Sequence, residues 1–280
     1  MDDGIIYWNL DPEIFSILGI FPIRYYSLLF ISGLFVALQV EKRIYRKENI
    51  PLENLDKLFI YVIVGIVLGA RLGHCFFYEP SYYLDNPLEI LLPIRKVADS
   101  YQFTGFQGLA SHGGTIGVIL AIVIYCRKYK TKFLWVLDRI AIVGPIVGAF
   151  IRFGNFMNSE VYGKPTNGNW GVVFQRDDLI PRHPTQLYEA FSYLLIFGIL
   201  MFIYHKTKGQ INGLILGVLL TLVFSARIVI EFFKENQVGF EDGMTLNMGQ
   251  ILSIPLVIIG LILIFTRKIP SHNKTSFEKP

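Results

Sequence analysis

The amino-acid sequence predicts an all-α integral membrane protein with seven transmembrane helices. Its 280 residues are 52% apolar and only 17% charged, whereas roughly 25% of the residues of an average soluble domain are charged. A helix needs about 20 mostly apolar residues to cross a bilayer, and seven windows bounded by charged or turn residues approach or reach that length. These windows are residues 18–40, 58–78, 109–126, 133–156, 186–204, 214–233 and 248–265.

The distribution of basic residues predicts the orientation. Of the 26 Lys and Arg residues, 15 fall in the loops after the first, third and fifth windows and in the C-terminal tail, and six fall in the longer loops on the other side. Short cytoplasmic loops carry the excess of Lys and Arg, so we expect the N-terminus outside and the C-terminus in the cytoplasm. The formal net charge is only +4, and no basic cluster on a polar face indicates a nucleic-acid partner.

Three segments lie outside the predicted spans of what we expect to be a single polytopic membrane domain, residues 1–280. The apolar stretch 87–94 is too short to cross and has charged neighbours, so residues about 79–108 are expected to form an arm along the membrane interface. Residues about 158–184 are expected to form an extracytoplasmic cap, and residues about 267–280 a cytoplasmic tail.

Five basic residues fall inside the windows, where an unpaired charge is costly. With a rise of about 1.5 Å per residue, four of them lie in the outer part of the membrane together with other polar side chains. The fifth, Arg139 beside Asp138, lies at the cytoplasmic end, and we expect it to reach the interface as an anchor. The outer layer comprises Arg24, Tyr26, Arg71, His112, Arg152, Asn155, His183, Gln186, Tyr188, Glu189, Arg227 and Glu231.

This outer layer predicts an electropositive cavity open to water or to lipid headgroups. Its four arginines outnumber its acids, which are chiefly Glu189 and Glu231. Guanidinium groups match the geometry of phosphate, and the phospholipid headgroup is the most abundant phosphate at this depth. The alternative is that each arginine is paired inside the protein. Arg227 and Glu231, at i and i+4, could neutralise each other.

One histidine of this layer begins a window, in the run Ser111-His112-Gly113-Gly114. The two glycines would leave the imidazole uncovered and near backbone N–H groups, so His112 could act as a base beside a bound anion. The alternative is a hydrogen-bonded structural histidine. No pair of histidines lies at i, i+4 and no acid or cysteine completes a ligand set, so we expect no metal and no other cofactor.

Glycines at every fourth position predict close helix packing. Gly65, Gly69 and Gly73 recur at this spacing in the second window, and Gly144 and Gly148 in the fourth. Small residues so spaced let helix backbones approach each other in lipid.

Seven short motifs occur in order along nearly the whole chain. They are RYY at 24–26, GARLG at 69–73, HGG at 112–114, RFGNFMNSEVYG at 152–163, RHPTQLYE at 182–189, Arg227 with EFF at 231–233, and MGQ at 248–250. Together they resemble the motifs of the prolipoprotein diacylglyceryl transferase family, bacterial enzymes that lipidate lipoprotein precursors.

The resemblance implies transfer of the diacylglyceryl group of phosphatidylglycerol to the lipobox cysteine thiol of a preprolipoprotein. The products are a thioether and glycerol phosphate, and the reaction is the first step of bacterial lipoprotein maturation. The implied location is the cytoplasmic (inner) membrane, with the active site toward the outer leaflet. The implied partners are phosphatidylglycerol, the lipobox peptide and the bilayer, without a cofactor.

The resemblance also carries essential residues onto this chain. These are Tyr26, His112, Arg152, Asn155, Glu160, Gly163, Arg227 and Glu231. We expect Arg152 and Arg227 to bind the phosphate and stabilise its departure, because an anionic leaving group needs cations. Asn155, Tyr26, Arg71 and Gly163 are expected in the phosphatidylglycerol site. The thiol proton could go to His112 or to a nearby carboxylate, Glu160 or Glu231.

The chain departs from the family pattern at three positions, and two other function classes stay open. Ile151 stands where glycine is usual, Val223 where tyrosine is frequent, and His74 where an aromatic residue is common. An anion transporter or channel would also use arginines in a membrane cavity, but a midplane site and an internal repeat are expected of it. A non-catalytic lipid-binding protein would leave His112 and Asn155 without a role.

Overall fold

The computed structural model describes residues 4–17, 21–92, 94–97, 100–103, 108, 110–235 and 243–266. The predicted cytoplasmic tail, 267–280, lies outside the described residues. The chain divides into two compact units, the first formed by Met1–Arg43 with Leu137–Pro280 and the second by Ile44–Val136.

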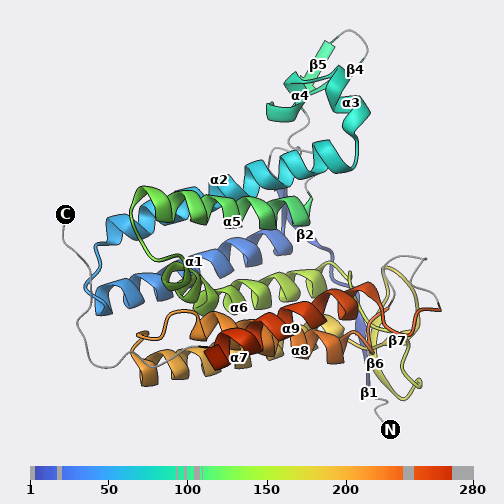
Figure 1. Cartoon of the computed structure of the whole chain (residues 1–280). Helices are drawn as coiled ribbons and strands as arrows, with labels where there is room; N and C mark the ends of the chain where they lie inside the picture. Colours follow the sequence, from blue (N-terminus) through green and yellow to red (C-terminus); the bar gives the residue numbers. More distant parts are fainter. Residues whose placement is uncertain are drawn as a thin grey trace. The chain divides into compact units, whose positions relative to one another are not determined.

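The described residues form nine helices and seven short strands (Figure 1). The helices are α1 (Tyr25–Lys47), α2 (Leu52–Phe77), α3 (Pro80–Asp85), α4 (Leu88–Leu91), α5 (Ser111–Lys128), α6 (Phe133–Met157), α7 (Thr185–Thr207), α8 (Leu214–Ile230) and α9 (Met248–Thr266). The strands are β1 (Gly4–Trp8), β2 (Glu13–Ile17), β3 (Phe21–Arg24), β4 (Ile94–Val97), β5 (Ser100–Phe103), β6 (Trp170–Phe174) and β7 (Pro181–Arg182).

Each predicted window overlaps one helix, and the described residues are mostly helical, which is consistent with the predicted all-α membrane protein. Among the described residues, α2, α6, α7 and α9 are long and apolar enough to cross a membrane, and α8 is a shorter apolar helix. Large apolar side chains such as Phe35, Ile60 and Phe202 stay exposed on the helices, as expected of surfaces that face lipid. The full count of seven spans stays a prediction.

The start of the first window is wrong. The chain at Phe21–Arg24 is a strand that pairs antiparallel with β2, with Glu13 opposite Arg24, and the helix begins only at Tyr25. The backbone N–H of Tyr25 donates to the carbonyl of Pro12 at 3.1 Å. Arg24 is therefore an exposed residue at the end of a strand, not an arginine inside a membrane helix.

In the first unit, a small mixed sheet forms over the ends of the helices (Figure 1). Its strand order is β1-β6-β7, with β1 parallel to β6 and β7 antiparallel to β6. Two isolated bridges extend the ladder, because Pro165 pairs with Arg182 and Gly163 pairs with Lys234. Trp8 of β1 and Phe174 of β6 form an aromatic cluster with Phe156 of α6. The predicted cap is thus tied by backbone hydrogen bonds to the chain that follows α8.

A buried carboxylate caps the N-terminal end of α8. Gly213, the N-cap of α8, has no side chain to cap the helix, and Asp138 of α6 accepts hydrogen bonds from the N–H groups of Gly213 and Leu216 at 2.6 and 2.8 Å. A carboxylate is favourable at this positive helix end. Its neighbour Arg139 is buried and donates to the carbonyl of Gly209 at 3.2 Å. The expectation that Arg139 reaches the interface as an anchor is wrong.

In the second unit, the glycine ladder of α2 packs against α5, as predicted. A Cβ on Gly65 would lie 2.7 Å from the Gly117 carbonyl oxygen, and one on Gly73 would lie 2.7 Å from Gly113 Cα. Among the described residues, Gly144 and Gly148 on α6 do not contact another backbone. Gly144 has open space beside it, and a Cβ on Gly148 would lie 3.0 Å from the Tyr193 ring. The prediction of close backbone packing is confirmed for α2 and wrong for α6.

The predicted arm is built from α3, α4 and the β4-β5 hairpin, and Arg71 of α2 holds it. The buried Arg71 guanidinium donates to the carbonyls of Glu89, Ile90 and Gly108, the last two at 3.1 and 3.4 Å. It also lies over the Tyr83 ring, 4.8 Å from the centroid. These contacts give Arg71 a structural role in the arm.

The glycine seam between α2 and α5 predicts a large difference between two identical substitutions. Gly117→Ala inserts a methyl group against backbone atoms of α2, so it should destabilise the protein by about 1–3 kcal/mol. Gly144→Ala fills open space and should leave the thermal unfolding midpoint unchanged or slightly raised. Thermal unfolding of both variants in the same detergent checks this. Equal midpoints would show that the seam is not tightly packed.

Candidate functional site

A polar site begins at the C-terminal end of α6. Arg152 Nη1 donates to Asn155 Oδ1 at 3.0 Å, and Asn155 Nδ2 donates to Glu160 Oε1 at 2.8 Å. Asn158 Nδ2 also donates to Glu160 Oε1, at 3.1 Å. One helix end and the loop after it therefore bring together a guanidinium, two amides and a carboxylate.

The loop that carries Glu160 has a strained backbone. Ser159 and Val161, on either side of Glu160, adopt φ angles of 56° and 59°, and a β-branched residue in this left-handed region is a marked outlier. Two side chains at the start of α7 hold the loop. Thr185 Oγ1 donates to the Val161 carbonyl at 3.2 Å, and Gln186 Nε2 donates to the Glu160 carbonyl at 2.8 Å. Glu160 is thus presented on a preorganised loop.

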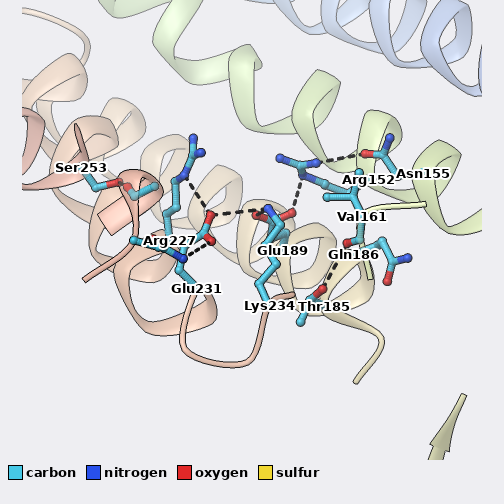
Figure 2. Close-up of polar contacts among 12 residues, drawn as sticks. Arg152, Asn155, Val161, Thr185, Gln186, Glu189, Arg227, Glu231, Lys234 and Ser253 are labelled. Carbon is cyan, nitrogen blue, oxygen red and sulfur yellow. Dashed lines mark hydrogen bonds and ion pairs between the residues drawn. The ribbon is translucent and has the colours of Figure 1, made fainter. Parts of the chain in front are cut away.

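A chain of ion pairs runs from α6 to α8 (Figure 2). Arg152 Nε lies 2.5 Å from Glu189 Oε2, and Arg227 Nε lies 3.4 Å from Glu231 Oε1. Lys234 Nζ lies 3.5 Å from both Glu189 Oε1 and Glu231 Oε1 and so joins the two pairs. The side chains of Glu189 and Lys234 are each only 2% exposed, whereas that of Arg227 is 39% exposed.

The charges in this chain do not cancel. The ion-pair chain has three cations and two carboxylates, so these five side chains together carry a net positive charge. Arg227 and Glu231 do form the predicted i, i+4 pair, but Glu231 shares its charge with Lys234 and accepts a hydrogen bond from Asn247 Nδ2 at 3.0 Å. Glu231 therefore does not fully neutralise Arg227, and the ion-pair chain as a whole suits an anion.

The start of α9 supports Glu231. Asn247 and Gln250 form a capping box, since each backbone N–H donates to the other's side-chain oxygen, at 3.1 and 2.9 Å. The box leaves Asn247 Nδ2 directed at Glu231. Gly249 makes room for the carboxylate, because a Cβ there would lie 2.6 Å from Glu231 Oε1. Gly249 and Gln250 of the MGQ motif thus help to position the Glu231 carboxylate.

Two further predicted site residues border the cluster. Tyr26 of α1 packs on Gly154, where a Cβ would lie 2.7 Å from the Tyr26 ring, and its hydroxyl is within electrostatic range of Arg152 and Glu160. Gly163 is buried between the segment that follows α8 and the segment that leads into α7. A Cβ on Gly163 would overlap the Phe233 carbonyl and lie 2.7 Å from His183 Cβ, so only glycine fits.

Arg182 fastens the cap next to this site. Its Nε and Nη2 donate to Asp178 Oδ2 at 2.9 and 2.5 Å, and its Nη1 donates to Glu235 Oε2 at 3.0 Å. The Arg182 guanidinium lowers the pKa of the Asp178 carboxyl. Burial lowers the pKa of His183, whose Nδ1 lies 3.2 Å from the Tyr188 hydroxyl. The imidazole is therefore neutral near pH 7.

Two predicted site residues belong to the second unit. His112 is exposed on the first turn of α5. The residue is thus uncovered, as expected, while Gly113 after it packs against α2, where its Cβ would lie 2.8 Å from Gly73 Cα. Arg71 is occupied by the carbonyl groups of the arm. Roles for His112 as a base and for Arg71 in phosphate binding stay predictions.

The three departures from the family pattern differ in what the structure says of them. His74 keeps an aromatic role, because its ring stacks on Tyr78 at 5.5 Å and its Nε2 lies 3.8 Å from Glu79 Oε1. Nothing in the described contacts explains Ile151 or Val223.

In the first unit the structure brings together seven predicted site residues: Tyr26, Arg152, Asn155, Glu160, Gly163, Arg227 and Glu231. Sequence reasoning missed Lys234, which it counted as a loop cation, and Asn247. The spacing of Lys234 three residues after Glu231 was the available signal. Glu189 was expected in the polar layer but not among the catalytic or binding residues.

The fold and the site define a helical membrane protein with a cluster of arginines, a lysine and carboxylates at the ends of α6, α7 and α8. Comparison with known proteins gives the family. The family model described as prolipoprotein diacylglyceryl transferase matches residues 12–266, so the chain belongs to the prolipoprotein diacylglyceryl transferase family and is a transferase.

Named relatives cover nearly the full length of the chain. It is 48% identical over 262 residues to the phosphatidylglycerol–prolipoprotein diacylglyceryl transferase of Bacteroides fragilis, which covers 93% of this chain and 94% of the relative. The proteins of the same name from Tolumonas auensis and Chloroherpeton thalassium are 47% and 46% identical. They cover 92% and 93% of this chain, and 96% and 93% of their own lengths.

Replacing Gly163 should detach the cap from the chain that follows α8. Gly163→Ala places a methyl group on the Phe233 carbonyl, which cannot move without breaking the hydrogen bond from Lys164 N–H. We expect faster proteolysis within residues 158–184 and a loss of about 1–3 kcal/mol of stability. Gly198→Ala, in open space on α7, is the matched control. Equal proteolysis rates in the two variants would contradict this account of Gly163.

Proposed function

We propose that this protein transfers the diacylglyceryl group of phosphatidylglycerol to the lipobox cysteine thiol of preprolipoproteins, as the first step of lipoprotein maturation. Family membership supports the reaction class, and the names of the relatives support phosphatidylglycerol and prolipoproteins as substrates. The observation that carries the proposal is the chain of ion pairs that sets Arg152 and Arg227 on one positively charged cluster.

The two arginines fit the bond changes of this reaction. The thiolate attacks the glyceryl carbon that bears the phosphate, a carbon–sulfur bond forms, and the carbon–oxygen bond to phosphate breaks. The electron pair leaves with glycerol phosphate, and the thiol proton goes to a base. Arg152 and Arg227 stabilise the charge that grows on the phosphate. Asn155 and Tyr26 border Arg152 and orient the headgroup, while Gly163 keeps the adjoining loop in place.

For the base, the contacts favour Glu160 over the other carboxylates of the first unit. Glu189 and Glu231 are buried, and each already lies against two cations, so a substrate thiol has little access to their oxygens. Glu160 is exposed, and among the described residues only amide groups hydrogen-bond its side chain. His112, exposed in the second unit, is the competing base.

We further propose seven spans with the N-terminus outside and the C-terminus in the cytoplasm, in the cytoplasmic (inner) membrane of a bacterium. The seven long helices and the excess of Lys and Arg in alternate loops support this topology. It puts the ion-pair chain toward the outer leaflet, the 158–184 cap outside, and the 79–108 arm at the interface. The lipobox peptide would then reach the site from the extracytoplasmic face.

Loss of either arginine should abolish lipid transfer. We expect Arg152→Ala and Arg227→Ala to lower kcat about 100- to 1,000-fold, because each removes a cation from the departing phosphate. The assay follows labelled diacylglyceryl transfer from phosphatidylglycerol to a lipobox peptide in detergent. The control is Arg176→Ala, which removes an exposed cap arginine paired with Asp11 and should retain activity. Anion flux through vesicles without any transfer would instead identify a channel or transporter.

A paired comparison identifies the base. If Glu160 accepts the thiol proton, Glu160→Gln should lower kcat about 100-fold or more. His112→Gln should then keep most of the activity. The reverse pattern would move the proton-transfer role to His112.

Labelling of introduced cysteines tests the orientation. Gly168→Cys in the cap should react with a membrane-impermeant maleimide added to intact cells, and Lys130→Cys, after α5, should react only after permeabilisation. The native Cys75 and Cys126 are buried and give the background. Reaction of Lys130→Cys in intact cells would overturn the proposed topology.

A further inference from the structure

Lys234 is the cation at the centre of the ion-pair chain, and its burial sets it apart. Its side chain is 2% exposed, and its Nζ lies 3.5 Å from one oxygen of Glu189 and 3.5 Å from one oxygen of Glu231. An ammonium group out of water is stable only when paired. Lys234 therefore requires the two carboxylates, whereas each carboxylate has a second cation, Arg152 or Arg227.

The cap fixes the backbone of Lys234. Lys234 forms a bridge with Gly163, the N–H of Lys164 donates to the Phe233 carbonyl at 2.8 Å, and the N–H of Glu235 donates to the Tyr162 carbonyl at 3.4 Å. Both neighbours of Lys234 are thus hydrogen-bonded to the cap segment that follows Glu160. The ammonium group is held between α7 and α8 by the cap, not by a flexible loop.

The charge balance of the ion-pair chain indicates how Lys234 affects Arg152 and Arg227. The chain has three cations and two carboxylates, and without the ammonium group two cations and two carboxylates would neutralise each other. Glu189 would then have only Arg152 as a cation partner, and Glu231 only Arg227, among the contacts of the described residues. Each carboxylate would hold its arginine more tightly, at the expense of an external anion.

We propose that Lys234 is a positioning residue that holds Glu189 and Glu231 so that Arg152 and Arg227 keep donors for the phosphate of the lipid substrate. Lys234 itself acts through these carboxylates and not by contact with the reacting atoms. This inference rests on the proposed function, because it assigns the anion to phosphatidylglycerol.

The first experiment compares Lys234→Met with Lys234→Arg. Lys234→Met removes the charge and keeps the length of the side chain, and we expect an about 100-fold loss of kcat/KM together with a raised KM for phosphatidylglycerol. Lys234→Arg keeps the charge and should restore most of the activity. Lys164→Met is the matched control, because Lys164 is exposed and, among the described contacts, its ammonium group donates only to the Phe232 carbonyl.

The second experiment restores the charge balance. The double variant Lys234→Met/Glu189→Gln again has one more cation than carboxylates and leaves no buried ammonium or carboxylate without a partner. We expect it to fold even if Lys234→Met alone does not. Binding is measured as the preference of each purified variant for spin-labelled phosphatidylglycerol over spin-labelled phosphatidylcholine in nanodiscs. The double variant should keep the preference of the wild type, and a folded Lys234→Met should lose it.

The outcomes separate this inference from the proposed function. If the wild type transfers no diacylglyceryl group, the proposed function fails, whatever Lys234 does. If the wild type is active and Lys234→Met matches it in kcat/KM, the role of Lys234 is refuted and the proposed function stands. If the double variant folds without preferring phosphatidylglycerol, or Lys234→Arg is as inactive as Lys234→Met, charge balance is not what Lys234 supplies.

Discussion

The geometry of the first unit depends on the shared burial of Glu189 and Lys234. Charges removed from water are costly unless each is paired and hydrogen-bonded, so these two groups tolerate few alternative arrangements. Glu189 comes from α7 and also pairs with Arg152 of α6. Lys234 comes from the segment after α8 and also pairs with Glu231, the partner of Arg227 of α8. One chain of ion pairs therefore ties three helices together at the depth where the anion is proposed to bind.

Glycines shape this site by leaving room for backbone and carboxylate groups. Gly163 admits the Phe233 carbonyl, Gly249 admits the Glu231 carboxylate, and Gly154 admits the Tyr26 ring. In each case a methyl group would displace a neighbour of the ion-pair chain. These glycines lie in or beside motifs that resemble those of the family, and the structure gives a packing reason for each. The same reasoning explains the glycine seam between α2 and α5.

Much of the helical fold could be predicted from the sequence, because apolar windows of spanning length have few alternatives to a helix in lipid. The start of α1 could not be predicted, since Phe21 to Ile23 continue the apolar window although pairing with β2 makes them a strand. The roles of Arg152, Asn155 and Glu160 follow from motifs in one local segment. Lys234 could not be found in this way, because its backbone is bridged to Gly163, a cap residue about 70 positions earlier in the chain, and a loop lysine is usually solvated.

The central claim is that Arg152 and Arg227 hold the phosphate of phosphatidylglycerol. Solid-state NMR measures it directly, through the dipolar coupling between the lipid ³¹P and ¹⁵N-labelled arginine side chains of the protein in phosphatidylglycerol bilayers. The account predicts guanidinium–phosphorus couplings at hydrogen-bond range in the wild type, with one set lost in Arg152→Lys and another in Arg227→Lys. Couplings that persist unchanged in both variants would place the phosphate elsewhere and contradict the account.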